Sequence, residues 1–133
     1  MPSADELLDA ARAARARAYA PYSNFTVGAA VETDDGEIVT GANVENASYG
    51  LSICAERAAI VRAVAQGHRV FRALAVAAPD GVDAAPCGAC RQFVAEFDPD
   101  MPVTFTGADG AVRTTLSKLL PLAFTAKSLT PRG

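Results

Sequence analysis

The chain has 133 residues, of which 50% are apolar and 20% are charged, an ordinary balance for a globular domain. Its net charge of −3 lacks the basic excess with which nucleic-acid-binding domains meet phosphates. No apolar run approaches the roughly 18 residues of a membrane span, and the N-terminus lacks a secretory-signal pattern. We therefore expect one cytoplasmic domain over residues 1–133, with neither nucleic acid nor a membrane as a partner.

The first quarter of the chain predicts a helix followed by a β-hairpin. Ser3 and Glu6 have the spacing of a capping box, and the alanine-rich helix that follows should end before Pro21, because a residue preceding proline is disfavoured in the α conformation. Residues 25–31 and 37–40 are β-type runs on either side of an Asp-Gly pair. This arrangement is typical of a hairpin.

A second helix and a buried strand occupy the middle of the chain. Ser52 is the expected N-cap of a helix over residues 53–66, and Gly67 is its expected C′ residue. Residues 71–78 are almost continuously apolar, as in a strand that is covered on both faces.

The last third of the chain predicts a helix and two more strands. The helix covers residues 87–97 and ends ahead of Pro99, and the strands cover residues 103–106 and 112–115. A final helical turn is expected at residues 116–120. The order α-β-β-α-β-α-β-β-α predicts an α/β fold, a three-layer sandwich in which helices cover both faces of a mixed five-stranded sheet.

All three cysteines of the chain lie between residues 54 and 90. An odd number of cysteines in a reducing compartment argues against a disulfide framework. Cys54 and the C-x-x-C pair of Cys87 and Cys90 offer three thiolates, which can hold a zinc ion and leave its fourth position to water. Each lies near the N-terminus of a predicted helix, where the helix dipole favours the thiolate. We therefore expect one Zn²⁺ per subunit at these three ligands.

Two residues next to Cys54 are assigned roles around that metal. A zinc ion lowers the pKa of its bound water to about 7, and Glu56 is placed to carry protons to and from that water. Three thiolates on Zn²⁺ leave a net negative charge, which Arg57 would offset by donating hydrogen bonds to sulfur. Alternatively, Arg57 is an ordinary solvated helix residue.

Other interpretations of the cysteines remain open. They could be three buried apolar residues, or the ligands of a structural zinc closed by His68, the only histidine. His68 follows the far end of the predicted helix from Cys54, and we expect it at the surface. A redox dithiol of Cys87 and Cys90 is a further alternative, but it leaves Cys54 and Glu56 without a role.

Polar residues follow the predicted hairpin. Asn43 and Glu45 are two residues apart and face the same side if the second strand continues. An amide and a carboxylate in that arrangement suit the hydroxyl groups of a sugar, although they could also be ordinary loop residues. Phe25 could stack on a flat base or belong to the core.

Taken together, the motifs closely resemble the short, homotetrameric, three-cysteine cytidine deaminases, and the resemblance runs almost the length of the chain. The zinc signature is the one shared by zinc nucleoside and nucleobase deaminases. The matching segments are Tyr22-Ser23-x-Phe25-x-Val27-Gly28-Ala29-Ala30, Asn43-Val44-Glu45-Asn46, Cys54-Ala55-Glu56-Arg57, Pro86-Cys87-x-x-Cys90 and Leu119-Leu120-Pro121-x-Ala123-Phe124.

The resemblance implies zinc-dependent hydrolysis of cytidine and 2′-deoxycytidine to uridine and 2′-deoxyuridine, with release of ammonia, in pyrimidine salvage. The alternatives are a blasticidin-S-type deaminase, which we would not expect to carry the Asn43 and Glu45 pair, and a non-catalytic structural zinc module.

The resemblance also implies substrate contacts for individual residues. Asn43 and Glu45 would hold the ribose 3′-hydroxyl, and Phe25 would pack on the base. The backbone N–H of Ala55 would meet the pyrimidine carbonyl, and the Ala85 carbonyl would accept from the exocyclic amine.

Three aromatic residues are implied to act between subunits of a homotetramer. Phe124 would reach into the pocket of a neighbouring subunit. Tyr22 and Tyr49 would lie near the subunit contacts.

Overall fold

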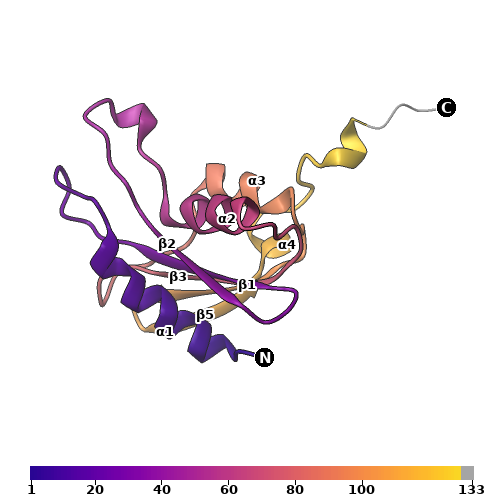
Figure 1. Cartoon of the computed structure of the whole chain (residues 1–133), viewed down its shortest axis with the longest axis horizontal. Coiled ribbons are helices and arrows are strands. Elements are labelled where there is room, and N and C mark those ends of the chain that lie inside the picture. The colour runs from indigo at the N-terminus through magenta and orange to yellow at the C-terminus, as the bar shows by residue number, and fades with distance from the viewer. Residues whose placement is uncertain (130–133) are drawn as a thin grey trace.

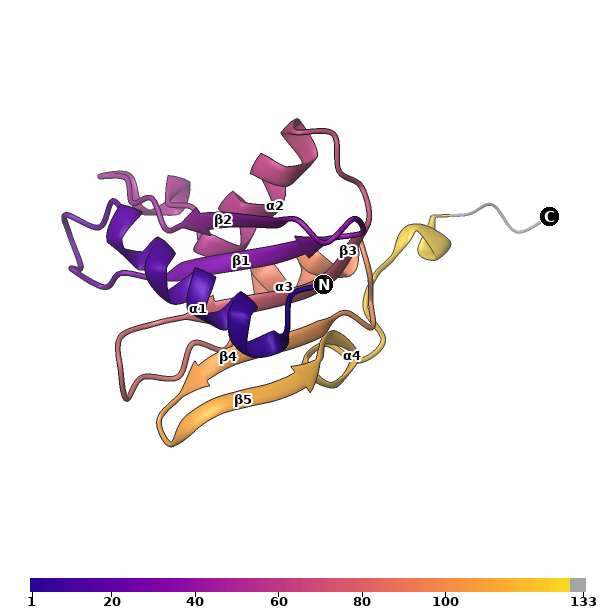
Figure 2. The same cartoon turned by 60° about the horizontal axis from the view of Figure 1, so that its bottom comes forward.

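One mixed sheet runs through the computed structural model, which describes residues 1–129. Its strand order is β2-β1-β3-β4-β5, and Figure 2 shows the strands side by side in this order. β3 and β4 pair in parallel, and the other neighbours are antiparallel. The strands are β1 Gly28–Thr33, β2 Ile38–Ala42, β3 Phe71–Ala77, β4 Pro102–Gly107 and β5 Gly110–Thr115. The predicted mixed five-stranded sheet is confirmed.

Helices cover both faces of this sheet, which confirms the predicted three-layer sandwich. In Figure 1, the helix at residues 4–14 lies below the sheet, and the other α-helices lie above it. The lower helix packs on Ala30, Ala75 and Ala77, whereas the upper helices enclose the larger core cluster. The lower helix is α1 Ala4–Ala14, and the upper ones are α2 Ala55–Ala65, α3 Gly88–Ala95 and α4 Leu116–Leu119. Among the described residues, no helix is both long and apolar enough to cross a membrane.

The predicted capping box begins α1. The Glu6 N–H donates to Ser3 Oγ over 3.1 Å, and the Ser3 N–H donates to Glu6 Oε1 over 3.4 Å. The helix lies very close to the sheet, because a Cβ on Gly28 would stand 2.0 Å from the Ala11 carbonyl oxygen. The helix then tightens into a 3-10 turn at Arg15–Arg17.

A second close approach fixes α2 on β2. A Cβ added to Gly41 would stand 2.3 Å from the backbone nitrogen of Ala59, so only glycine allows the helix to lie at this depth. The buried face of α2 is Ala55, Glu56, Ala59, Ile60 and Ala63. Close packing of this helix holds its N-terminal turn, which carries Glu56, at one end of the sheet.

The start of α2 differs from the sequence prediction. Ser52 does not cap the helix; Cys54 is the N-cap and Ala55 the first helical residue. After a 3-10 turn at Tyr49–Leu51 the chain is extended at Ile53, because Ile53 and Val44 exchange backbone hydrogen bonds of 2.8 and 3.0 Å. The Ser52 hydroxyl instead accepts from the Asn46 N–H over 3.0 Å. The expected C′ residue Gly67 is confirmed by its φ of +103°.

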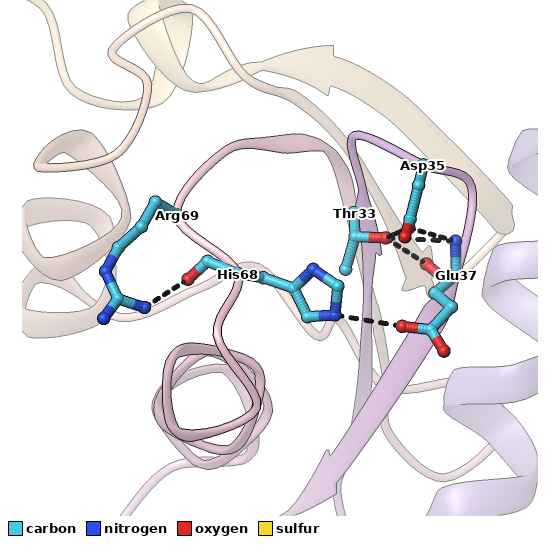
Figure 3. Close-up of polar contacts among 5 residues, drawn as sticks. All are labelled: Thr33, Asp35, Glu37, His68 and Arg69. Atoms are coloured by element: carbon cyan, nitrogen blue, oxygen red, sulfur yellow. Dashed lines mark hydrogen bonds and ion pairs between the residues drawn. The ribbon is translucent and has the colours of Figure 1, made fainter.

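His68, which we expected at the surface, is partly buried there. Its side chain is only 16% exposed, and its Nε2 lies 2.9 Å from Glu37 Oε2. Figure 3 shows the imidazole turned toward Glu37, beside Asp35, which accepts hydrogen bonds from Thr33 Oγ1 and the Glu37 N–H. The Thr33 hydroxyl, followed by the Glu37 N–H, lowers the pKa of the Asp35 carboxyl.

Candidate active site and metal centre

Two helix N-termini bring the three cysteines together. Cys54 is the N-cap of α2, Cys87 is the N-cap of α3, and Cys90 lies in the first turn of α3. Their sulfur atoms all lie within 4.8 Å of one another, and the Sγ atoms of Cys54 and Cys87 are 3.9 Å apart. The predicted convergence of the three thiols is therefore present in the fold.

The sulfur spacing suits a zinc ion. Tetrahedral zinc with bonds of about 2.3 Å to sulfur requires sulfur atoms about 3.8 Å apart, close to the separation of Cys54 and Cys87. Among the described residues, this metal-capable group has only its three cysteines, whereas His68 is grouped with Asp34 and Asp35. Three thiolates without a fourth protein ligand fit a metal that keeps a position open for chemistry.

Contacts among the thiols shift the pKa values of Cys54 and Cys90 in opposite directions. The hydrogen bond from Cys90, followed by those from Arg57 and Cys87, lowers the pKa of the Cys54 thiol to about 5. The same contact with Cys54, together with burial, raises the pKa of the Cys90 thiol. Cys54 therefore ionises first. A metal cation bound to its sulfur would then displace the protons of the neighbouring thiols, because metal ligands bind as thiolates.

Arg57 lies against the sulfur side of the site. Its Nη2 atom is 3.8 Å from Cys54 Sγ and 3.5 Å from the Ser52 carbonyl oxygen. Its Nε is buried without a hydrogen-bond partner among the described residues. A guanidinium held here at the cost of an unpaired N–H is not a freely solvated side chain, which argues against the alternative interpretation of Arg57.

Glu56 is buried between the cysteines and a pocket. It is 4% exposed, and burial raises the pKa of its carboxyl group, with the charge of Cys54 acting in the same direction. A raised carboxyl pKa at the wall of a cavity is the property that a proton carrier needs at neutral pH.

The pocket in front of Glu56 has a volume of about 580 Å³. It is lined by residues from the loop before β1, the segment after β2, the start of α2, and the end of β3 with the loop that follows it. These residues are Tyr22, Ser23, Phe25, Val27, Asn43, Glu45, Tyr49, Ser52, Ile53, Cys54, Ala55, Glu56, Val76, Ala78, Asp83, Ala84, Ala85 and Cys87. A cavity of this size is in the range of small-molecule sites.

Asn43 and Glu45 both line this pocket, although β2 ends at Ala42 and the segment continues only as isolated bridges at Val44. Glu45 Oε1 accepts from the N–H groups of Tyr22 and Ser23 over 3.0 and 3.2 Å. The Asn43 side chain accepts from Val27 N–H over 2.8 Å and donates to the Phe25 carbonyl over 2.9 Å. Both residues therefore bind the loop before β1 while facing the cavity.

The other candidate residues divide between the pocket and its surroundings. Phe25, Tyr22 and Tyr49 line it, as do Ala55 and Ala85. Phe25 lies outside β1, which begins three residues later than the predicted strand.

Phe124 is not among the residues that line the pocket. It is 57% exposed, and its carbonyl oxygen accepts from Gln92 Nε2 over 2.7 Å.

Sequence reasoning missed two side chains that organise the site. Arg91 donates to the Pro86 carbonyl over 2.7 Å and to the Leu119 carbonyl over 2.8 Å, so it braces the loop before Cys87 against the end of α4. The Ser23 hydroxyl donates to the Glu45 carboxylate and accepts from the Phe25 N–H. The position of Arg91 directly after Cys90 was the one available signal for it, whereas Ser23 was marked only as a member of the matching segment Tyr22-Ser23-x-Phe25 and was given no role.

A buried carboxylate beside three converging thiols, at the wall of a cavity, defines a class of protein: a metal-dependent hydrolase with zinc as the fitting metal. Comparison with known proteins identifies the family within this class to which the chain belongs.

Residues 1–106 match the family model described as "Cytidine and deoxycytidylate deaminase zinc-binding region". A cytidine deaminase of Sporosarcina psychrophila is 47% identical over 127 residues, which cover 94% of this chain and 93% of that protein. A crystal structure of the cytidine deaminase from Burkholderia pseudomallei has a TM-score of 0.87 at 49% identity and covers 92% of this chain and 100% of that one. A blasticidin-S deaminase of Bacillus cereus is 36% identical over 107 residues, covering 74% of this chain and 76% of that protein.

The chain belongs to the cytidine deaminase family of zinc hydrolases.

Proposed function

We propose that this protein catalyses the zinc-dependent hydrolytic deamination of cytidine and 2′-deoxycytidine to uridine and 2′-deoxyuridine, with release of ammonia, as a step of pyrimidine salvage. The observation that carries the proposal is the placement of Glu56. This carboxyl group is 4% exposed and lines the same cavity as Asn43 and Glu45.

Cys54, Cys87 and Cys90 would hold the zinc ion. When bound, zinc acts as a Lewis acid that supplies hydroxide at neutral pH. The geometry of the three sulfur atoms and the absence of a fourth cysteine, histidine or carboxylate from their group in residues 1–129 support this assignment.

Glu56 carries the protons of the reaction. It takes one proton from the attacking water and delivers it to N3 of the base while a C–O bond forms at C4. It then assists transfer of the second proton to the exocyclic amine, the C4–N bond breaks, and ammonia leaves. Water and cytidine are thereby converted to uridine and ammonia. The pKa of Glu56, raised mainly by burial, supports a group that both accepts and donates near neutral pH.

Hydrogen-bonding capacity supports recognition of a single sugar hydroxyl. An ionised carboxylate offers about four acceptor sites, and Glu45 already uses three of them on Tyr22 N–H, Ser23 N–H and Ser23 Oγ. The remaining site accepts from one hydroxyl, which in turn accepts from the second N–H of the Asn43 amide. We assign this hydroxyl to the 3′ position, so a 2′-hydroxyl is not required.

The base would lie between Phe25 and the first turn of α2. Phe25 packs on its face, the Ala55 N–H donates to the pyrimidine carbonyl, and the Ala85 carbonyl accepts from the exocyclic amine. The N–H groups of the first helical turn lack partners within the helix, and Ala55 is the first residue of α2. This arrangement supports Ala55 as the donor.

We propose further that the 133-residue chain forms one catalytic domain that works in the cytoplasm as a homotetramer. Phe124 would enter a neighbouring pocket, and Tyr22 and Tyr49 would lie near the subunit contacts. The high exposure of Phe124, Tyr22 and Tyr49 (57, 51 and 75%) supports their burial by another chain. The net charge of −3 supports a free nucleoside, and not a nucleic acid, as the substrate.

Loss of cytidine absorbance in the presence of purified protein tests the proposal. We expect turnover that a zinc chelator abolishes and added zinc restores. Absence of turnover by the zinc-loaded protein would refute it. A parallel assay of blasticidin S, alone and in competition with cytidine, tests the alternative suggested by the Bacillus cereus relative; faster turnover of blasticidin S would favour that alternative.

A further inference from the structure

The Ser23 hydroxyl connects the two parts of the pocket that contact substrate in the proposed function. It donates a hydrogen bond to Glu45 Oε2, and it accepts one from the Phe25 N–H over 3.0 Å. One hydroxyl group thus bonds both to the carboxylate assigned to the sugar and to the backbone of the aromatic residue assigned to the base.

The loop that carries Ser23 is held mainly by polar contacts. Residues 21–25 are exposed, and Phe25 retains 39% of its surface in solvent. The loop turns through Asn24, whose φ of +57° lies in the left-handed region, which asparagine tolerates better than most residues. The Asn24 N–H donates to the Ala20 carbonyl over 3.0 Å. Burial does not fix this loop, so its hydrogen bonds determine where Phe25 lies.

Those hydrogen bonds come from the pocket itself. The N–H of Phe25 is bonded to Ser23 Oγ, and its carbonyl is bonded to the Asn43 amide over 2.9 Å. The N–H groups of Tyr22 and Ser23 are bonded to Glu45. Removing the Ser23 hydroxyl would leave Glu45 Oε2 and the Phe25 N–H without these partners.

We propose that Ser23 is a positioning residue for substrate binding, which aims Glu45 at the sugar and holds Phe25 against the base. This inference rests on the proposed function. It has a specific consequence: sugar recognition and base packing weaken together when the hydroxyl is removed, whereas proton transfer at Glu56 does not depend on it.

Ser23→Ala should therefore raise KM for cytidine with little change in kcat. Because the hydrogen bond between Ser23 and Glu45 is exposed to solvent, its loss should have a modest effect, and we expect KM to rise about tenfold. Ser23→Thr keeps the hydroxyl and should restore most of the wild-type KM. Ser117→Ala, on α4 and outside the pocket lining, is the matched control and should behave as wild type.

A second substrate separates a positioning role from general loosening of the protein. The wild-type enzyme should discriminate against 3′-deoxycytidine, because that substrate cannot donate to Glu45. In Ser23→Ala this discrimination should shrink, since Glu45 is no longer held in place. An unchanged ratio of the two kcat/KM values, or a loss confined to kcat, would overturn the proposal. Equal melting temperatures of the variants check that the comparison is between folded proteins.

Amide hydrogen exchange tests the same contacts without turnover. The N–H groups of Tyr22, Ser23 and Phe25 should be protected in the wild-type protein and lose protection in Ser23→Ala, while strand β1 keeps its protection. Rapid exchange of these amides in the wild type would refute the inference. A wild-type protein that shows the protection but does not deaminate cytidine would refute the proposed function and, with it, the catalytic consequence of Ser23, while leaving the loop contacts established.

Discussion

The two sides of the pocket are built in different ways. On the metal side, Cys90, Ala55 and Glu56 are 0 to 4% exposed and lie on helices packed against the sheet. On the sugar side, Phe25 is 39% exposed and Glu45 lies beyond the end of β2. Packed helices hold the first side in place, although Cys54 is only half-buried and Cys87 is exposed, and hydrogen bonds between loops hold the second.

This difference matches the role that the proposed function gives to each side. Proton transfer requires groups fixed in a site with little water, where electrostatic effects are strong. The proposed function also requires substrate to enter and leave, and a loop stabilised by polar contacts can exchange those contacts with solvent or substrate. We therefore expect changes on the metal side to lower kcat and changes on the sugar side to raise KM.

The largest expected effect is that of Glu56→Gln. The amide has nearly the same shape as the carboxyl group but cannot carry a proton, so kcat should fall by at least about 10²- to 10⁴-fold. Zinc content and melting temperature should stay close to wild type, because the substitution leaves the three cysteines in place. Steady-state kinetics, metal analysis and thermal unfolding check this, and substantial turnover by the variant would contradict the role of Glu56.

Glu45→Gln provides the matching test of the sugar side. It removes the charge that strengthens hydrogen bonds to the loop and to the sugar, so KM for cytidine should rise by about 10- to 100-fold, with a smaller change in kcat. Glu37→Gln is the matched control, since Glu37 contacts His68 and is not among the residues that line the pocket. A loss in kcat as large as that of Glu56→Gln would remove the distinction between the two sides.

Arg57→Gln should weaken the metal side without touching substrate. The variant loses the contact between the Arg57 guanidinium and Cys54 Sγ, and loss of a group that contacts a metal ligand typically costs about 10- to 100-fold in metal affinity. Competition with a chromogenic zinc chelator measures this. KM for cytidine, determined at saturating zinc, should remain near wild type; zinc affinity equal to wild type would show that Arg57 has no part in metal binding.

The smallest effect should be one of stability. Gly41→Ala places a Cβ 2.3 Å from the Ala59 nitrogen, so α2 must move away from the sheet at a cost of about 1–3 kcal/mol. Gly50→Ala is the control, because nothing lies within 4 Å of the added Cβ. Denaturant unfolding compares the two, and equal stabilities would show that the depth of α2 is not fixed by this contact.

The contrast between the metal side, which lies on helices, and the sugar side, which is built from loops, also explains which features the sequence could predict. The metal centre depends on three cysteines placed by local helix signals, and the structure confirms their convergence. The prediction that Ser52 caps α2 was wrong because a pairing of Ile53 with Val44, a contact between distant segments, keeps the chain extended up to the helix.

Hydrogen bonds between distant segments, both on the sugar side and behind the loop before Cys87, could not be predicted for a related reason. The bond from Ser23 to Glu45 spans 22 residues, and the bond from Arg91 to Leu119 spans 28. No local pattern encodes either of them. The position of Phe25 outside β1 likewise follows from its bonds to Ser23 and Asn43 and not from its β-type neighbours.

The two hydrogen bonds of Arg91 have a practical consequence for work with shortened chains. The Arg91 guanidinium donates hydrogen bonds to the Pro86 carbonyl, one residue ahead of Cys87, and to the Leu119 carbonyl, while the neighbouring Gln92 donates to the Phe124 carbonyl. Removing the C-terminal residues from α4 onward would therefore disturb the loop before Cys87, even though all three cysteines would remain.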